Sequence, residues 1–424
     1  MDVCRLTASL RCVRTSSSRC RAEAFQPKGA AHSSLLRLLV SPTLNHKVQA
    51  TCVDSLSDSV RCQGEAAVIP AKPAPVVRLV RSDEGGGAGM NASVLTPVYI
   101  DFLQSMSFSR SRESCYPELL DVVVAGVKAN GGSHLPEPYI KSGACFGHLV
   151  YSFHPVDLQA KIGHFTALGL MADDLASNLT GAARERYLED MRLFHMKFTN
   201  PEGYARLYPG RGNLHAVLEN FIVYLKTDQN PFFPTELRLH SLMIKSVFDF
   251  MEANLQEQHY ERHPIEYTAD MSQLPRFLRY KSGVSEVFSH FVILQTSSSG
   301  SASRDEHFFY NELYPMVPEL IDFIDFGNDV LSFYKELQEG EDSISIVTHS
   351  RIHNLPLLQS LQERMEAVIH SRTRLMALAD RTGSDAIKDR IVKFFQGFMS
   401  CHIGDKRYRL DEVLRGWYNG GSWA

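Results

Sequence analysis

Apolar residues recur with a period near 3.6 along almost the whole chain after residue 95, and this pattern constrains the fold more than any other feature. The windows that follow it are 155–172, 182–198, 213–226, 237–257, 307–337, 353–382 and 384–402. Short stretches such as TDQNPFFP and QTSSSGSASRD separate them, and no long segment alternates with the period of two that a strand requires. The sequence therefore predicts an all-α fold, a helical bundle formed by one domain of roughly 330 residues.

The first 91 residues differ in composition from the rest. Residues 1–90 hold 12 Lys/Arg against 7 Asp/Glu, and the stretch RLTASLRCVRTSSSRCRAEAF is rich in Arg and Ser, as organellar transit peptides are. A disordered extension or an over-long predicted start of the protein are the alternatives. A Pro-rich stretch then runs into the Gly-rich linker DEGGGAG. We expect a disordered, low-complexity extension over 1–91, with a possible targeting role, and a helical domain over 92–424.

Charge and cysteine usage argue against several classes of protein. The net charge of -4 and the absence of a GxxxxGK loop argue against nucleic acid as a partner, and no run of 18 apolar residues predicts a membrane span. Five of the eight cysteines lie in the first 62 residues, and none forms a CxxC pair. This pattern indicates neither a disulfide framework nor a zinc site, and it favours a reducing compartment. We expect a cytoplasmic protein, or an organellar one if the N-terminal segment is a transit peptide.

Three oxygen-bearing side chains lie four residues apart in the segment FGNDVLSFYKEL. Asn328, Ser332 and Glu336 share one helical stripe, because four residues turn a helix by only about 40° beyond a full turn. The same stripe runs back through the apolar Ile324 and Leu320, which predicts a helix that lines a cavity with a polar mouth. Amide, hydroxyl and carboxylate oxygens are the hard ligands that Mg²⁺ prefers. The alternative is an ordinary polar helix face.

Two adjacent carboxylates, Asp173 and Asp174, follow the apolar run in HFTALGLMADDLASN. The small residues Gly169 and Thr166 lie back along the Asp173 stripe and leave room beside it. A glycine inside a helix costs about 1 kcal/mol relative to alanine, so Gly169 indicates close packing or a cavity wall. Paired aspartates at a solvated helix end are the alternative.

Four further side chains could bind an anion. In GDKRYRL, Arg407 can donate a fork of hydrogen bonds to phosphate oxygens and Tyr408 can add one more. Lys335 lies about 100° around the helix from Glu336 and can act as a point charge. Arg279 follows an apolar pair in QLPRFLRYKSG. Each alone also fits a surface position, but two predicted metal-binding helices and separate Arg donors together indicate a site for diphosphate.

These segments carry a resemblance to a known family. The pattern Asn328-Asp-x-x-Ser332-x-x-Lys335-Glu336 resembles the NDxxSxxxE metal motif of class I terpene synthases. The string NDVLSFYKELQEGEDSISIV resembles the corresponding region of fungal trichodiene synthases, and CHIGDKRYRLDEV resembles their C-terminal basic motif of type DRRYR. The resemblance covers roughly residues 95–424 and implies the single helical bundle of class I terpenoid synthases, with a central active-site cavity.

The resemblance also implies a role for each residue at the site. Asp173 would bridge two Mg²⁺ ions as the main ligand of the aspartate-rich motif, and Asn328, Ser332 and Glu336 would chelate a third. These four are the expected catalytic and metal-binding residues, with three Mg²⁺ ions as the cofactor. The residues expected to bind the diphosphate are Arg279, Lys335, Arg407 and Tyr408, of which Arg279 has the loosest local similarity.

The chain departs from the family pattern at two places. The usual DDxxD motif is changed here, because Ser177 and Asn178 occupy its later positions, and Lys406 stands where Arg is usual. The first departure puts a metal role of the later positions in doubt, and it could loosen closure or shift the product.

By resemblance, the chain is a magnesium-dependent sesquiterpene cyclase. It would ionise farnesyl diphosphate, cyclise the carbocation to a hydrocarbon with trichodiene as the leading product, and release diphosphate; a homodimer is the assembly that the family implies. One alternative is a chain-elongating prenyltransferase, which would carry a second DDxxD where this chain has the Asn/Ser/Glu triad. The other is a catalytically degenerate relative that binds a prenyl diphosphate without turning it over.

Overall fold

The computed structural model describes residues 90–109, 117–226, 237–293, 306–341, 344–415 and 417. The predictions for the N-terminal extension and its linker lie outside the described residues, apart from its last two positions. All the described residues belong to one compact unit, Val77–Ala424.

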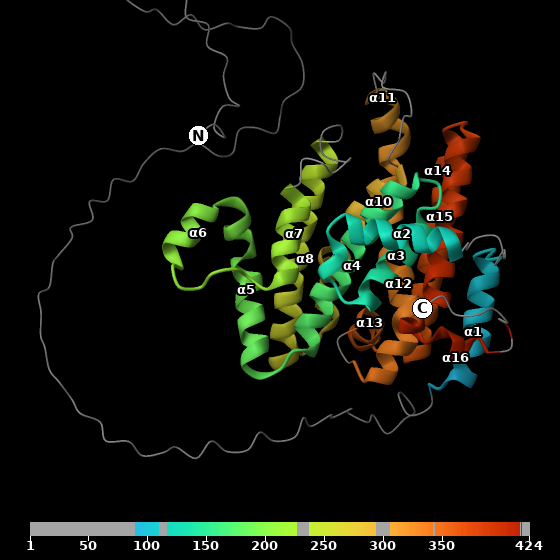
Figure 1. The fold of residues 1–424 in the computed structure, drawn as a ribbon. Coiled ribbons are helices and arrows are strands. Elements are labelled where there is room, and N and C mark those ends of the chain that lie inside the picture. Colours follow the sequence, from blue (N-terminus) through green and yellow to red (C-terminus); the bar gives the residue numbers. More distant parts are fainter. Residues whose placement is uncertain are drawn as a thin grey trace, which may run out of the picture. The chain divides into compact units, whose positions relative to one another are not determined.

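Every regular element among the described residues is a helix, so the predicted all-α fold is confirmed (Figure 1). The α-helices are α1 (Ala92–Ser105), α2 (Pro117–Ala129), α3 (Glu137–Val150), α4 (Val156–Asn178), α5 (Gly181–Thr199), α6 (Pro201–Leu207), α7 (Ala216–Lys226), α8 (Leu237–Arg262), α9 (Leu274–Ser282), α10 (Ser285–Ile293), α11 (Glu306–Phe308), α12 (Val317–Glu339), α13 (Ser345–His353), α14 (Leu357–Arg381), α15 (Asp385–Gly404) and α16 (Leu410–Val413). Short 3-10 or π turns are η2 (Gly132–His134), η3 (Ala269–Met271), η4 (Phe309–Leu313), η5 (Tyr314–Met316) and η6 (Lys406–Tyr408).

Two of the predicted helical windows are interrupted. The window 307–337 becomes α11, the turns η4 and η5, and then α12, with Pro315 in the 3-10 turn and Pro318 near the first position of α12. Proline has no N–H to donate and restricts the residue before it, so a new helix begins here. The window 353–382 is split at Asn354, which has a left-handed φ of 51° and is followed by Pro356.

The helices around the site pack closely where glycines face a neighbouring backbone. A Cβ atom at Gly143 of α3 would lie 2.3 Å from the carbonyl oxygen of Gly163 in α4. A Cβ atom at Gly397 of α15 would lie 1.9 Å from the carbonyl oxygen of Leu149 in α3. These contacts leave no room for a side chain, and they hold α3 between α4 and α15.

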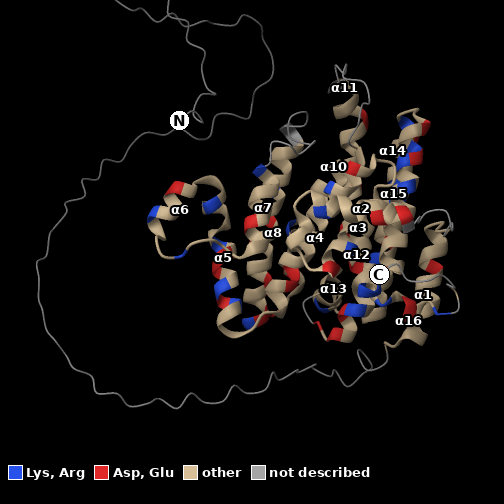
Figure 2. Cartoon of the chain, viewed as in Figure 1, with Lys and Arg blue, Asp and Glu red and all other residues tan. Residues whose placement is uncertain are grey.

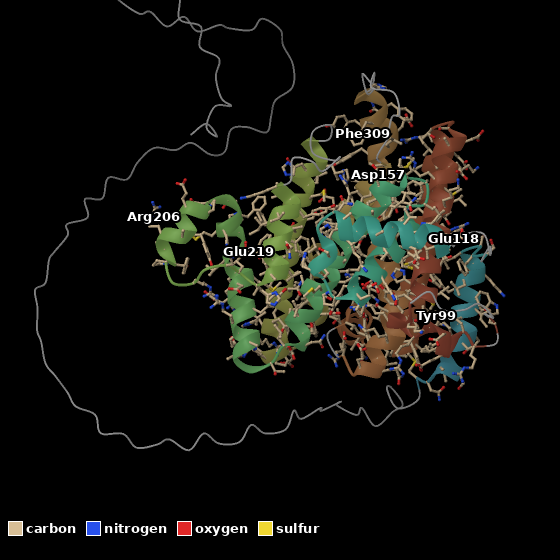
Figure 3. The ribbon with its side chains drawn as sticks, in the orientation of Figure 1. Tyr99, Glu118, Asp157, Arg206, Glu219 and Phe309 are labelled. Atoms are coloured by element: carbon tan, nitrogen blue, oxygen red, sulfur yellow. The ribbon has the colours of Figure 1, made fainter. Side chains whose placement is uncertain are left out.

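Helix α1 is tied to the C-terminal part of the chain. Tyr99, labelled in Figure 3, is buried, and its hydroxyl donates to the backbone carbonyl of Val330 in α12. Thr96 donates to the carbonyl of Val413 in α16. None of the described helices is both long enough and apolar enough to span a bilayer.

Candidate active site

The α12 stripe changes from buried apolar residues to polar ones, as the spacing predicted, but none of Asn328, Ser332 and Glu336 lines either of the two cavities near these helices. Leu320 and Ile324 are buried in the core, Ser332 is buried, and Asn328 and Glu336 are half-buried. The Ser332 hydroxyl donates to the Asn328 carbonyl oxygen at 2.7 Å and also hydrogen-bonds Glu336. Burial raises the pKa of Glu336 to about 7, against the lowering effect of the Ser332 hydrogen bond, and the nearby Glu341 carboxylate adds to the rise.

Arg279, from α9, reaches this stripe. Its Nη2 donates to Asn328 Oδ1 at 2.8 Å, and its Nε lies 2.8 Å from Asp329 Oδ1. Burial lowers the pKa of this guanidinium, but the Asp329 carboxylate and its neighbours more than compensate, so the net pKa is raised. Arg279 is therefore charged at the site, and it engages the amide oxygen that the resemblance assigns to a metal.

Asp173 lies inside α4 rather than at a solvated end, because the helix continues to Asn178. Its carboxyl group is half-buried, and burial together with the neighbouring Asp174 raises its pKa. One turn earlier, a Cβ atom on Gly169 would meet no other atom within 4 Å. Gly169 therefore borders open space, which agrees with a cavity wall and not with close packing.

Asp174 holds the predicted anion-binding residue Arg407. The Arg407 Nη1 and Nη2 atoms donate to the two carboxylate oxygens of Asp174 at 2.8 and 2.7 Å. Burial by itself raises the pKa of Asp174, but the hydrogen bonds and charge of Arg407 lower it overall. Asp174 thus positions Arg407 through a contact between α4 and η6, a role that the sequence did not predict.

Of the other two predicted residues, Tyr408 lies in η6 and Lys335 is on α12 itself. The ring of Tyr408 lies 4.4 Å from that of His402, whose Nε2 is 3.4 Å from the Asn328 side-chain nitrogen. Lys335 is mostly buried and pairs with Glu339, with 3.3 Å between Nζ and Oε2.

All eight predicted side chains come together. The charges of Arg407, Lys335 and Arg279 each lower the pKa of Asp173, against the larger rise from burial. Glu336 in turn acts on Tyr408 and Arg279. Figure 2 shows acidic and basic residues spread over the helices, with both kinds present near α12 and α13. Residues more than 230 positions apart in the sequence, such as Asp174 and Arg407, thus belong to one cluster of acidic and basic side chains.

Two acids at the site were not predicted. Glu257 of α8 is half-buried, and burial, with Asp173 next, raises its pKa to about 8. Burial also raises the pKa of Glu341, just after α12. Neither belongs to a recognisable motif, since only the packing of α8 and α12 brings them to Asp173. From the 3.6-residue period alone, Glu257 could at most have been noted as an acidic residue in an ordinary amphipathic helix.

The residues present fit a divalent cation. Burial raises the pKa of Asp173, Glu257 and Glu336, and a neighbouring acid adds to each rise, so a cation beside them would stabilise their charged forms. Among the described residues, no group of three or more His, Cys, Asp or Glu side chains is arranged to hold a metal. A metal here would be held by mixed amide, hydroxyl and carboxylate oxygens together with substrate oxygens, as Mg²⁺ often is. The metal roles of the individual residues stay predictions.

Two cavities lie near these helices. One, of about 70 Å³, borders Arg279 and Glu257 and is otherwise lined by Tyr260, Tyr267, Pro275, Leu278, Ser282, Ser345 and Thr348. A larger one, of about 320 Å³, lies between α10, α11 and α15 and contains none of the predicted site residues. The site is therefore located by its charged groups and not by the larger of these two cavities.

The fold and the site together define the class of protein. It is an all-helical bundle in which acidic side chains face Arg and Lys side chains at one site. The family model described as trichodiene synthase matches residues 210–418. That range contains Arg279, the Asn328 stripe and Arg407, but not Asp173.

Several similar proteins are named as terpene synthases. The terpene synthase BipA of Cochliobolus sativus is 25% identical over 205 residues, which cover 48% of this chain and 59% of the relative. An (E)-beta farnesene synthase of Metarhizium brunneum is 23% identical over 277 residues, covering 65% of this chain and 75% of the relative. A trichodiene synthase of Fusarium pseudograminearum is 28% identical over 173 residues, covering 40% and 43%.

The predicted resemblance to fungal trichodiene-synthase-like terpene synthases is confirmed by these matches. The aligned part spans only 59% of the first of these relatives, BipA. The fold class and the family resemblance are therefore established, whereas the reaction of this chain is treated below as a proposal.

Proposed function

We propose that this chain is a magnesium-dependent sesquiterpene synthase that ionises farnesyl diphosphate and releases diphosphate. The observation that carries the proposal is the convergence of Asp173 from α4 and the Asn328 stripe of α12 with Arg279, Lys335 and Arg407. The names of the relatives, terpene, trichodiene and farnesene synthases, support a sesquiterpene substrate.

The basic residues are placed to bind a diphosphate. Two of the five N–H donors of Arg407 are used by Asp174, and its other donors can reach a phosphate oxygen. Arg279 has to release Asn328 Oδ1 if it turns toward the diphosphate, which frees that amide oxygen. Lys335 adds a third cation and the Tyr408 hydroxyl a neutral donor. Positive charge fixed at the leaving group lowers the barrier to breaking the allylic C–O bond.

The acids are placed to hold cations beside the same leaving group. Asp173 on α4, and Asn328, Ser332 and Glu336 on α12, would be the protein ligands. Bound Mg²⁺ would supply charge stabilisation of the departing diphosphate. The pKa of Glu336, about 7, means that its proton has to leave before its carboxylate can act as a full ligand near neutral pH.

The prenyl chain would lie along the apolar part of α4. Phe165 and Gly169 precede Asp173 by eight and four residues, so the three share one stripe, and open space borders Gly169. The Phe165 ring contacts Phe288 at 5.8 Å, and Phe288 contacts Phe146 at 5.2 Å. These rings could stabilise a carbocation through cation–π attraction and keep water away from it. The contour of this wall would select the product, with trichodiene as the first candidate.

The departure from the DDxxD motif leaves this arrangement intact. Ser177 and Asn178 are exposed in the last turn of α4, whereas Asp173 faces the site. The exposure of Ser177 and Asn178 therefore gives no support to the alternative hypothesis that this chain is a catalytically degenerate relative.

A direct test uses the purified full chain with Mg²⁺ and farnesyl diphosphate, with volatile products identified by gas chromatography and mass spectrometry. Geranyl and geranylgeranyl diphosphates in parallel reactions define the chain length, and isopentenyl diphosphate tests for chain elongation. We expect a sesquiterpene hydrocarbon that disappears with EDTA. The proposal is wrong if no hydrocarbon forms and if Mg²⁺ with inorganic pyrophosphate leaves the melting temperature unchanged.

A further inference from the structure

A buried carboxylate of α12 lies three residues before Asn328 and outside every motif discussed above. Asp325 is fully buried, and its Oδ2 accepts from Arg276 Nη1 at 2.7 Å. Its Oδ1 accepts a hydrogen bond from the Ser285 hydroxyl. Arg276 belongs to α9 and Ser285 is the first residue of α10, so one carboxylate binds both sides of the junction between these helices.

The backbone of that junction is shaped around the carboxylate. A Cβ atom on Gly283 would lie 2.2 Å from Asp325 Oδ1, so only glycine lets the carboxylate come this close. The next residue, Val284, has a left-handed φ of 52°, which is unfavourable for a β-branched side chain. The surrounding contacts therefore have to hold this conformation, and the Asp325 carboxylate lies directly against the preceding residue, Gly283.

The same α9 helix carries Arg279 one turn after Arg276. Arg279 Nη2 is 3.4 Å from the Asp325 carbonyl oxygen and 2.8 Å from Asn328 Oδ1, and its Nε pairs with Asp329. Arg276, which binds Asp325, and Arg279, whose guanidinium lies at the site, are thus one helical turn apart on α9. Both side chains contact α12.

We propose that Asp325 is a positioning residue for Arg279: through Arg276, Ser285 and the space left by Gly283, it fixes the α9–α10 junction on α12 and so sets where the Arg279 guanidinium meets Asn328. This inference rests on the proposed function, since the ligand that Arg279 would bind is the diphosphate.

The test is a double-mutant cycle on the full chain, with the affinity for inorganic pyrophosphate in the presence of Mg²⁺ measured by calorimetry. Asp325→Asn keeps the shape of the side chain but replaces its charge and one acceptor. We expect it to weaken pyrophosphate binding about tenfold, because the Arg279 guanidinium would be misplaced and its charge-assisted hydrogen bond to the anion would be lost. In an Arg279→Ala background, the same substitution should weaken binding no further, because residues that act through one another are not additive. A purely structural role would weaken binding in both backgrounds.

Two further variants keep the outcome clear. Asp322→Asn touches the same Arg276 but not the junction, and it should bind pyrophosphate as the wild type does. Arg276→Gln, at a side chain that is 32% exposed, removes the anchor from the other side and should repeat the loss seen with Asp325→Asn even if that variant folds poorly.

The outcomes separate the two proposals. If the wild type binds pyrophosphate with Mg²⁺ but the cycle is additive, or if both anchor variants bind as the wild type does, Asp325 does not position Arg279. If the wild type binds none and yields no hydrocarbon, the proposed function fails, and this inference fails with it.

Discussion

The carboxyl group of Glu257 lies among other acids, and burial raises its pKa from an ordinary 4.5 to about 8. In the unfolded chain the group ionises near its ordinary pKa, so over this interval the unfolded state binds fewer protons than the folded state. The free energy of unfolding should therefore fall as pH rises from about 4.5 to about 8. We expect Glu257→Gln to flatten this fall, as measured by urea unfolding in EDTA at several pH values.

The matched control for Glu257 is Glu261→Gln on the same helix, where the side chain is 59% exposed. It should keep the pH dependence of the wild type, apart from a small loss from its surface ion pair with Arg184. Equal slopes in the wild type and Glu257→Gln would show that this carboxyl group does not change its proton binding on folding.

The polar stripe of α12 makes a second prediction at the same scale. Asn328→Ala and Glu336→Ala should each lower turnover by a factor of about 100 or more, because they remove site groups rather than core contacts. Helical content by circular dichroism should remain that of the wild type. Gln338→Ala, at an exposed position near the end of the same helix, serves as the control. Loss of fold with normal specific activity in the folded fraction would instead mark the stripe as structural.

Asp174 should matter through Arg407. Asp174→Asn removes the charge from a bidentate pair, so Arg407 loses its fixed position at the site. We expect the KM for the prenyl diphosphate to rise about tenfold with a smaller change in kcat, since ground-state and transition-state binding are both weakened. Asp157→Asn, exposed in the first turn of the same α4, should leave both constants unchanged. A pure kcat loss would point to Asp174 as a metal ligand.

At the scale of helices, two glycines with opposite surroundings offer a matched pair. Gly397→Ala would place a Cβ 1.9 Å from the Leu149 carbonyl oxygen and push α15 away from α3. We expect the free energy of unfolding to fall by about 2 kcal/mol or more. Gly169→Ala meets no atom within 4 Å and should instead raise it by about 0.5–1 kcal/mol, because alanine favours a helix. Chemical denaturation measures both, and destabilisation by Gly169→Ala would contradict the open space described beside it.

The helices themselves could be predicted from sequence because their signal is local. The windows 182–198, 213–226 and 384–402 match α5, α7 and α15 closely, and the spacing of Asn328, Ser332 and Glu336 gave the polar stripe. The windows 155–172 and 237–257 stop well before the ends of α4 and α8, and α1, α2, α3, α9 and α10 fell in no predicted window. The Asp174–Arg407 pair could not be predicted, because it joins residues 233 positions apart and depends on how α4 meets η6. The same holds for Glu257 and for Asp325, whose surroundings are made by helices that the sequence does not place.

At the scale of the whole molecule, the candidate site is held by elements from most of the described chain. Helix α4 supplies Asp173, α8 supplies Glu257, α9 supplies Arg279, α12 supplies the polar stripe and η6 supplies Arg407. Burial, with neighbouring acids, raises the pKa of Asp173, Glu257 and Glu336, so a cation would stabilise their charged forms. Arg279, Lys335 and Arg407 each pair with a carboxylate of the chain and could also bind an anion. A metal and a diphosphate together would satisfy both sets of charges and link these helices.

If the acids hold the metal and the basic residues hold the diphosphate, the two ligands should stabilise the folded chain together. A ligand present at about 100 times its Kd stabilises the folded state by about 2.7 kcal/mol, which corresponds to a rise in Tm of roughly 5 °C for a domain of this size. We expect this rise with Mg²⁺ and inorganic pyrophosphate together, and little change with either alone. Scanning fluorimetry measures it, with Glu336→Ala as the variant that should lose it and the exposed Gln338→Ala as the one that should keep it. An equal rise with pyrophosphate alone would mean that the basic residues bind the anion without any metal held by the acids.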